Sequence, residues 1–407
     1  MNIIMKKRVI SVILALLMMI AILPKENSYA ATTSMVYSYT TMLESDGAIY
    51  YIKTAVDTGA ADIYKLVVST GKKTMIASSD NYISNMIYYA GTIYYTTVED
   101  NSFVIYSVDI DGANLSKICN GSVIYADANG IFYSVTTLSE SYLYKKSDDG
   151  SSDKLIQKAN TTFNYVKNIG STLYFSQYID SNSKIKLYSI NSNASKLTLL
   201  DTQTVNKDTY GGYIVIVSDI IKMNGDIYYQ YGTEQGTGHF WYGVLVKIDS
   251  DTDKKTIITK NMNIYTLEHS QNYIYYYDME DYSIKYKYNT KSDKISKFSC
   301  KTSDSESYNI LGDKTYCAKP VSKKYITVSQ FTSGTDKKNL IKNFMKISYK
   351  QNSTLNYTAN VKKLGNYFLV SVETVDYNDA TYGWRGHYIG IKWYVADADG
   401  KVITSFS

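Results

Sequence analysis

The hexapeptide Gly91-Thr92-Ile93-Tyr94-Tyr95-Thr96 shows the pattern on which this chain is built: a turn residue, then an apolar residue and two aromatic residues. Copies of the apolar-aromatic-aromatic triplet begin at Ile49, Ile93, Ile131, Leu173, Ile227 and Ile274, with weaker copies at Thr315 and Tyr367. The successive spacings are 44, 38, 42, 54, 47, 41 and 52 residues. A period of about 40 to 50 residues is typical of four-stranded propeller blades.

Each copy has the same internal order. A turn with Gly or Asn precedes the triplet, and the triplet opens a second strand. A variable loop leads to a third strand, such as Leu187–Ile190. A hairpin rich in Asp, Asn and Gly, such as Asp109–Gly112, then leads to a short fourth strand, such as Leu115–Cys119. Gly and Asn suit these turns because they tolerate positive φ.

The repeat predicts an all-β fold, a single β-propeller of four-stranded antiparallel blades. We count eight blades. The seventh, residues 307–347, is the poorest match, so seven blades remain the alternative. The chain has 44 Tyr among 407 residues, and Tyr favours strands. Most of the repeated rings are expected to pack between neighbouring blades as core.

The N-terminus has the features of a secretion signal. Lys6, Lys7 and Arg8 precede an apolar run from Val9 to Leu23, and Ser28-Tyr29-Ala30 supplies small residues for cleavage. We expect residues 1–30 to be a signal peptide and residues 31–407 to be the propeller domain. The predicted location is extracellular, with cell-wall association open. An uncleaved anchor is the alternative. We expect a monomer with no stable membrane span after processing.

Removal of this segment lowers the formal net charge from +5 to +2, because four basic residues and Glu26 leave with it. A nearly neutral protein lacks the basic footprint of a nucleic-acid-binding protein, so no nucleic-acid partner is expected. The three cysteines are Cys119, Cys300 and Cys317. Cys300 and Cys317 are candidates for a disulfide, and buried thiols are the alternative.

The same residues carry a family resemblance. Ile93-Tyr94-Tyr95-Thr96 resembles the Tyr-Trp-Thr-Asp repeat of low-density-lipoprotein-receptor-type propellers, and the Asp-x-Asp-Gly hairpins resemble those of TolB-like propellers. The resemblance extends over almost all of residues 32–407 and implies the fold of secreted bacterial propellers whose function is largely unassigned. The chain departs from the receptor pattern, with Tyr or Phe where Trp would stand, so receptor-type ligand binding is not implied.

Few residues favour catalysis or a cofactor. His239, His269 and His387 lie far apart, and none is in a zinc-binding or hydrolase motif. Asp249-Ser250-Asp251-Thr252-Asp253 begins like a calcium loop, but Lys254 and Lys260 stand where Gly and Glu are needed. We expect no cofactor and no catalytic residues from motifs. A weak surface calcium site stays open, and turn formation is the simpler interpretation.

Two long loops differ from the rest of the repeat. They connect the second and third strands of the fifth blade, residues 231–242, and of the eighth blade, residues 376–388. Together they hold two of the three Trp and two of the three His. In a propeller, second-to-third connections emerge on one face, so we expect both loops beside one channel mouth. The candidate ligand-binding residues are His239, Trp241, Tyr382, Trp384, Arg385 and His387.

Aromatic rings in glycine-containing loops form flat contact surfaces, while Arg supplies directional hydrogen bonds. The leading hypothesis is a non-enzymatic binding propeller that recognises an extracellular glycan, cell-wall polymer or protein. One alternative is a propeller enzyme such as a polysaccharide lyase, with His239 or His387 as base and Arg385 neutralising a carboxylate. Another is a structural or envelope-assembly module. Packing of these aromatics against their own blades is the structural alternative to a site.

Overall fold

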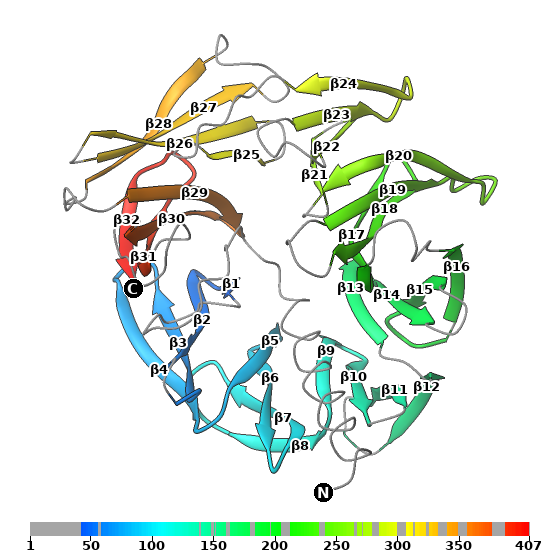
Figure 1. Cartoon of the computed structure of the whole chain (residues 1–407). Helices are drawn as coiled ribbons and strands as arrows, with labels where there is room; N and C mark the ends of the chain where they lie inside the picture. Colours follow the sequence, from blue (N-terminus) through cyan, green and yellow to red (C-terminus); the bar gives the residue numbers. More distant parts are fainter. Residues whose placement is uncertain are drawn as a thin grey trace, which may run out of the picture. The chain divides into compact units, whose positions relative to one another are not determined.

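The chain is all-β, with eight four-stranded antiparallel blades arranged as a β-propeller (Figure 1). The computed structural model describes residues 42–55, 58–137, 140–147, 150, 152–159, 163–179, 184–195, 197–204, 212–235, 241–263, 267–270, 272–278, 285–298, 307–311, 314–322, 325–332, 340–348, 356–376 and 387–406. The predicted fold class and the count of eight blades are confirmed. The predicted signal peptide lies outside the described residues.

The described residues fall into two compact units. The first unit is Asn81–Thr266, which holds blades 2 to 5. Its strands are, in blade 2, β5 (Ile83–Tyr89), β6 (Thr92–Glu99), β7 (Ser102–Asp109) and β8 (Ser116–Asn120); in blade 3, β9 (Ser122–Asp127), β10 (Gly130–Thr136), β11 (Ser141–Lys146) and β12 (Asp153–Ala159); in blade 4, β13 (Phe163–Ile169), β14 (Thr172–Ile179), β15 (Lys184–Asn191) and β16 (Leu197–Thr204); in blade 5, β17 (Gly212–Met223), β18 (Asp226–Gln235), β19 (Trp241–Ile248) and β20 (Lys255–Asn263).

The second unit combines Asn27–Asp80 with Leu267–Ser407, and holds blade 1 together with blades 6 to 8. Its strands are, in blade 1, β1 (Met42–Ser45), β2 (Ala48–Thr54), β3 (Ala61–Val67) and β4 (Lys72–Ser79); in blade 6, β21 (Glu268–Ser270), β22 (Tyr273–Tyr277), β23 (Lys285–Asn289) and β24 (Lys294–Phe298); in blade 7, β25 (Ser307–Leu311), β26 (Lys314–Ser322), β27 (Tyr325–Thr332) and β28 (Leu340–Ser348); in blade 8, β29 (Asn356–Leu364), β30 (Tyr367–Asp376), β31 (His387–Ala396) and β32 (Val402–Phe406).

Every blade is formed by one continuous segment of chain. Within each unit, the first strands of neighbouring blades contact one another, as β5 does β9 and β25 does β29. The hydrophobic core therefore consists of clusters between adjacent blades. One cluster joins Phe132 of blade 3 to Phe175 of blade 4, and another joins Tyr51 of blade 1 to Trp393 of blade 8. Blade 8 thus packs against blade 1 inside the second unit.

The predicted order of turn and triplet is confirmed. A two-residue turn joins the first and second strands of each blade, as Ser45 pairs with Ala48 and Tyr89 pairs with Thr92. Gly91 in the second of these turns has φ +87°, a conformation that Gly adopts without strain. In the first copy, Ile49, Tyr50 and Tyr51 are at most 3 % exposed. The triplets are core residues, as expected.

The paired strands arrange the aromatic residues in rows that run across a blade. Tyr51 of β2 lies directly opposite Tyr64 of β3, which lies opposite Met75 of β4. The two rings stack with centroids 5.6 Å apart. Equivalent stacked pairs recur in blades 2, 3 and 4: Tyr95 with Tyr106, Tyr133 with Tyr144, and Phe175 with Tyr188. Cross-strand aromatic pairs of this kind stabilise a sheet beyond the area they bury.

The eighth copy of the triplet is displaced by one residue from its predicted position. Leu364 pairs with Tyr367 across the turn, so Phe368, Leu369 and Val370 take the places of Ile49, Tyr50 and Tyr51. Tyr367 is only partly buried, whereas Leu369 and Val370 are fully buried. The sequence did not reveal this shift because Tyr367 is itself aromatic.

A β-bulge recurs in the fourth strand. In seven blades the pairing of the third and fourth strands skips one residue, for example Ile156 between Leu143 and Tyr144 of the partner strand. The skipped residues are Ile76, Ile118, Ile156, Leu200, Ile258, Phe344 and Ile403. A bulge bends and twists its strand, so each outer strand has an irregular edge. Among the described residues, no helix is long and apolar enough to cross a membrane.

Candidate functional site

The predicted loop segments fall between β18 and β19 and between β30 and β31, but residues 231–235 and 241–242 of the first belong to the strands, as do Asp376, His387 and Tyr388 of the second. Trp241 is the first residue of β19 and pairs with Glu234. His387 is the first residue of β31 and pairs with Asp376. The other candidates lie outside the described residues: His239, Tyr382, Trp384 and Arg385. Blades 5 and 8 belong to different units, so the gathering of both loops at one face stays a prediction.

The hairpins that carry these loops have long second strands. β18 and β30 have 10 residues each, whereas the second strands of the other blades have between 5 and 9. Unbroken pairing of β18 with β19 continues from Ile227 to Glu234. The loop of blade 5 is therefore held on a regular antiparallel ladder rather than on an irregular connection.

A buried carboxylate lies in the interface between blades 4 and 5. Asp201 of β16 is 8 % exposed and accepts a hydrogen bond from the Tyr229 hydroxyl of β18 at 2.5 Å. The same carboxylate accepts bonds from the Gln203 amide at 2.9 Å and from the Thr202 backbone N–H at 2.7 Å. These three donors hold the side chain of Asp201 in one position.

The pKa values of the neighbouring phenols reflect this environment. Burial, followed by the charge of Asp201, raises the pKa of Tyr231 to about 12. Burial likewise raises the pKa of Tyr229 well above the ordinary value, and the Asp201 charge and hydrogen bond act in the same direction. Both phenols remain neutral hydrogen-bond donors at physiological pH. They therefore do not provide a general base.

A second acid links the first strands of the same two blades. Asp219 of β17 is 5 % exposed and accepts hydrogen bonds from the Lys167 ammonium of β13 at 3.0 Å and from the Ile220 N–H at 2.7 Å. A bulge at Ser218 precedes Asp219, and another at Val166 precedes Lys167. A β-bulge changes the direction of nearby side chains, and each residue of this ion pair directly follows a bulge.

Gln230 supplies unused hydrogen-bonding capacity in this region. It lies opposite Asp219, is fully buried, and neither its amide oxygen nor its amide nitrogen has a partner. In blade 2 the equivalent residue, Thr96, accepts a hydrogen bond from the Val123 N–H of blade 3 at 2.9 Å. A buried amide without partners costs about 1–3 kcal/mol. Gln230 comes four residues before Glu234, near the loop of blade 5.

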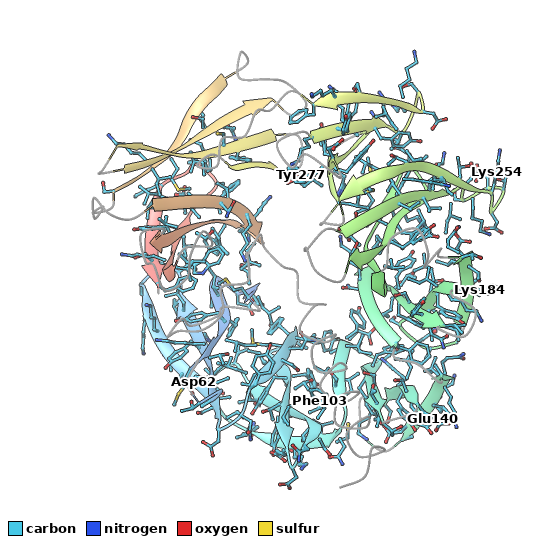
Figure 2. The ribbon with its side chains drawn as sticks, viewed as in Figure 1. Asp62, Phe103, Glu140, Lys184, Lys254 and Tyr277 are labelled. Carbon is cyan, nitrogen blue, oxygen red and sulfur yellow. The ribbon has the colours of Figure 1, made fainter. Side chains whose placement is uncertain are left out.

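Blade 6 contains a buried lysine. Lys285 of β23 is 2 % exposed, forms an ion pair with Glu268 of β21, and lies 4.5 Å from the ring centroid of Tyr277. Its pKa is raised: burial acts to lower it, but the Glu268 charge and the contacts with Glu268 and Tyr277 outweigh burial. Lys285 stays charged and joins the first strand of the blade to the third (Figure 2, where Tyr277 is labelled).

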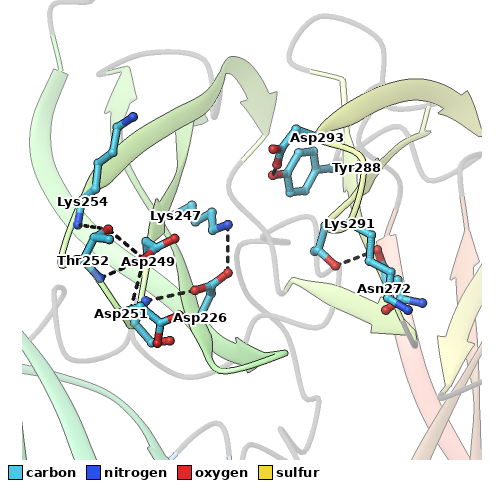
Figure 3. A network of polar contacts seen from close by, with 12 residues as sticks. Asp226, Lys247, Asp249, Asp251, Thr252, Lys254, Asn272, Tyr288, Lys291 and Asp293 are labelled. Carbon is cyan, nitrogen blue, oxygen red and sulfur yellow. Dashed lines mark hydrogen bonds and ion pairs between the residues drawn. The ribbon is translucent and has the colours of Figure 1, made fainter.

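The acidic hairpin of blade 5 is a hydrogen-bonded turn. One oxygen of Asp249 accepts bonds from the Thr252 N–H at 2.9 Å, the Thr252 hydroxyl at 2.8 Å and the Asp251 N–H at 3.2 Å (Figure 3). Lys247 forms an ion pair with Asp226 at 2.9 Å beside it. The Asp residues therefore take part in a hydrogen-bonded turn, and the weak surface calcium site stays a prediction. Among the described residues, no three His, Cys, Asp or Glu side chains gather as a metal site.

Sequence reasoning missed these polar contacts for a physical reason. Asp201 and Tyr229 come from neighbouring blades and are 28 residues apart, and nothing in either strand marks a partner. The one available signal was the charge pattern of β23, where Lys alternates with Tyr in Lys285-Tyr286-Lys287-Tyr288 and one face must be buried. The pairing of Cys300 with Cys317 stays a prediction, because Cys300 lies outside the described residues.

Comparison with known proteins gives only distant structural similarities. No family model matches it, and no curated protein matches it in sequence. Among solved structures it is similar to a prolyl endopeptidase, with 10 % identity, a TM-score of 0.49, and coverage of 83 % of this chain and 54 % of that chain. The chain thus spans about half the length of that relative.

Two further structures are similar along most of their own length. Sqt1 of Saccharomyces cerevisiae has 11 % identity and a TM-score of 0.47, with 90 % of this chain and 99 % of that chain covered. An oligogalacturonate lyase in complex with manganese has 11 % identity and a TM-score of 0.39, with 70 % and 86 % covered. Similarities this distant indicate no activity, ligand or partner for the chain, whose assignment ends at an eight-bladed β-propeller.

Proposed function

We propose that this protein is a secreted, non-enzymatic binding propeller whose ligand is an extracellular polymer, with glycan or cell wall as the first class. The observation that carries the proposal is the position of Trp241 and His387. Each belongs to the strand pair next to the loop, in one of the two hairpins with the longest second strands. Long ladders hold loops at fixed positions, and rigid aromatic residues bind at a low entropic cost.

The buried contacts around the loop of blade 5 support binding rather than catalysis. Asp201 and Asp219 are each held by several donors, and Tyr229 and Tyr231 hold their protons at physiological pH. Such groups orient a loop without accepting or releasing protons. Gln230, with its amide unbonded, is the residue of this region with capacity for a further polar contact.

The test is sedimentation with purified cell wall and with insoluble polysaccharides, using the full chain and the variants Trp241→Ala and Trp384→Ala. We expect each variant to lose most of the retention and to keep the melting temperature of the parent. Trp393→Phe is the matched control, because Trp393 is 2 % exposed in blade 8 and its loss should lower stability while leaving retention unchanged.

Two results would overturn the proposal. Retention that survives both loop substitutions would show that the loops are not the site. Cleavage of a uronic-acid polymer, abolished by His239→Ala or His387→Ala, would assign the protein to the enzyme class instead.

A further inference from the structure

The fourth strands of the eight blades together carry an excess of lysine, which comes from six of them, because β16 and β32 contain no Lys. We call these eight strands (β4, β8, β12, β16, β20, β24, β28 and β32) the rim strands, because each ends its sheet and has only one neighbouring strand. They contain eleven Lys, all exposed: Lys72, Lys73, Lys117, Lys154, Lys158, Lys255, Lys260, Lys294, Lys297, Lys342 and Lys346. Their only acids are Asp153, which is exposed, and Asp201, which is buried.

This excess contrasts with the rest of the chain. The whole sequence has 43 basic residues and 38 acidic ones, so removal of the rim strands leaves 32 basic against 36 acidic residues. The small net charge of the whole chain is therefore the sum of the basic rim strands and a slightly acidic remainder. In blade 1 the pKa of Lys73 is lowered, first by burial and then by the positive charges of Lys53 and Lys392.

Exposed aliphatic side chains alternate with these lysines. Met75, Leu155, Leu199, Ile257 and Ile295 are between 43 % and 54 % exposed on five different rim strands. The first four occupy one equivalent position, directly before the bulged residue. Leu155 lies between Lys154 and Lys158, and Ile257 between Lys255 and Lys260. Blades 3 and 5 thus each present an exposed apolar side chain flanked by lysines, whereas β16, which carries Leu199, contains no Lys.

The first unit shows how the lysines are held. Lys154 of blade 3 donates to the Ala194 carbonyl of blade 4 at 2.9 Å, and Lys158 forms an ion pair with Glu140 at 2.7 Å. Leu199 of blade 4 follows on the next rim strand, and β20 of blade 5 adds Lys255, Ile257 and Lys260. Figure 2 shows side chains projecting along this edge of the unit, with Lys254 labelled just before β20.

Lysines on edge strands commonly prevent edge-to-edge pairing, and that role accounts for the one or two lysines on each of six rim strands. It does not explain the aliphatic residue beside them. The occupant is also not an added β-strand, because the bulge interrupts the regular ladder that strand addition requires. A ligand that contacts the side chains themselves fits both observations.

We propose that the rim strands bind a linear acidic polysaccharide. Carboxylates of the polymer pair with the lysines, and the apolar C–H faces of its sugar rings pack on the aliphatic side chains. Each exposed charge pair contributes little, but a repeating polymer engages several blades of one unit together. The chain has only two Arg, Arg8 and Arg385, so recognition depends on charge and spacing rather than on bidentate contacts. The rim strands share no residue with the loops of blades 5 and 8.

The experiment measures binding of polygalacturonate to the full chain by affinity electrophoresis, with neutral dextran and inorganic polyphosphate as comparison probes. The test variant is Lys154→Gln with Lys255→Gln and Lys260→Gln. The control is Lys222→Gln with Lys291→Gln and Lys401→Gln, which removes the same charge from exposed positions outside the rim strands. We expect the test variant to raise the dissociation constant about tenfold, because several weak charge pairs are lost together. The control should change it little.

Four further results decide the inference. Replacing the same three rim lysines by Arg should restore binding, and binding should weaken as salt rises. Equal loss in the test and control variants would show a general charge effect and overturn the rim as the site. Tighter binding of polyphosphate than of polygalacturonate would overturn the assignment to a polysaccharide.

The loop variant Trp241→Ala with Trp384→Ala separates this inference from the proposed function. If it abolishes polygalacturonate binding while the rim variant does not, the loops are the site and the rim inference fails. If only the rim variant loses polygalacturonate, the rim inference stands whatever the loops bind.

Discussion

At the scale of single residues, the tyrosines have two environments. In rows such as Tyr51-Tyr64-Met75 they stack across the strands of a blade, and their burial was predictable from the repeat. In the interface of blades 4 and 5, Tyr229 and Tyr231 are also repeat residues, but they lie beside a buried carboxylate. The repeat predicts that the ring is buried but does not predict what the hydroxyl contacts.

Removal of one hydroxyl tests this difference. Tyr229→Phe should lower the free energy of unfolding by about 1–3 kcal/mol, because it takes a donor from the buried Asp201 carboxylate. Tyr106→Phe is the matched control: its hydroxyl also donates to a carboxylate at 2.5 Å, that of Glu99, whose side chain is 35 % exposed. Urea unfolding should show a clear loss for the first and little change for the second. Equal losses would contradict the role of burial.

Alkaline pH should destabilise the fold. Burial raises the pKa of Tyr95 and of Tyr231 to about 12, whereas the unfolded chain releases these protons near pH 10. The unfolded state therefore binds fewer protons above about pH 10, and stability is full below that value and falls as pH rises towards about 12. Thermal unfolding across this range checks the direction. The stability of Tyr231→Phe should fall less steeply with rising pH than that of the parent. An unchanged slope would argue against a raised pKa of Tyr231.

At the scale of strands and turns, the sequence predicted the turns and second strands correctly but did not predict the registers in which the strands pair. Gly and Asn mark the turns, and alternation marks the second strands, because both depend on residues close in sequence. The fourth-strand bulge left no signal, since an apolar pair such as Leu155-Ile156 is compatible with either pairing. The candidate loop residues were predictable as exceptions to the repeat, whereas contacts such as Asp201 with Tyr229 depend on how two blades pack.

Two glycines in tight turns allow a matched test of an inter-blade contact. Gly91 and Gly400 have φ of +87° and +84°, but a Cβ at Gly91 meets nothing within 4 Å, while one at Gly400 would lie 2.0 Å from the Phe344 carbonyl oxygen. Gly91→Ala should cost about 1–2 kcal/mol for the left-handed conformation alone. Gly400→Ala should cost more, because the hairpin of blade 8 must move away from blade 7. Equal melting temperatures would contradict this contact.

At the scale of the whole molecule, the ends of the described chain meet through aromatic rings. Tyr51 of blade 1 stacks on Phe406 of β32 at 4.7 Å, and Phe406 stacks on Trp393 at 6.4 Å. With Tyr64 these rings form a continuous stack between the first and last blades, which belong to one unit. Side-chain packing rather than a shared sheet joins blade 8 to blade 1.

Phe406→Ala should therefore have a specific effect on blade 1. A loss of about 3–5 kcal/mol is expected for any buried Phe. The matched control is Phe298→Ala, since Phe298 also ends a fourth strand, is 3 % exposed, and contacts Tyr275 of its own blade. Limited proteolysis should cut residues of blade 1 faster in Phe406→Ala than in Phe298→Ala. The same cleavage pattern in both variants would contradict the role of the aromatic stack in holding blade 1 against blade 8.

The continuity of each blade in sequence has a consequence for how the chain could be rearranged. Because every sheet is formed by consecutive strands, a circular permutation that opens the chain between two blades would divide no sheet. Blades 1 and 8 pack together in one unit, so a linker between Met42 and Phe406 would join neighbouring blades. Strand pairing within the blades therefore does not require the chain to start at blade 1.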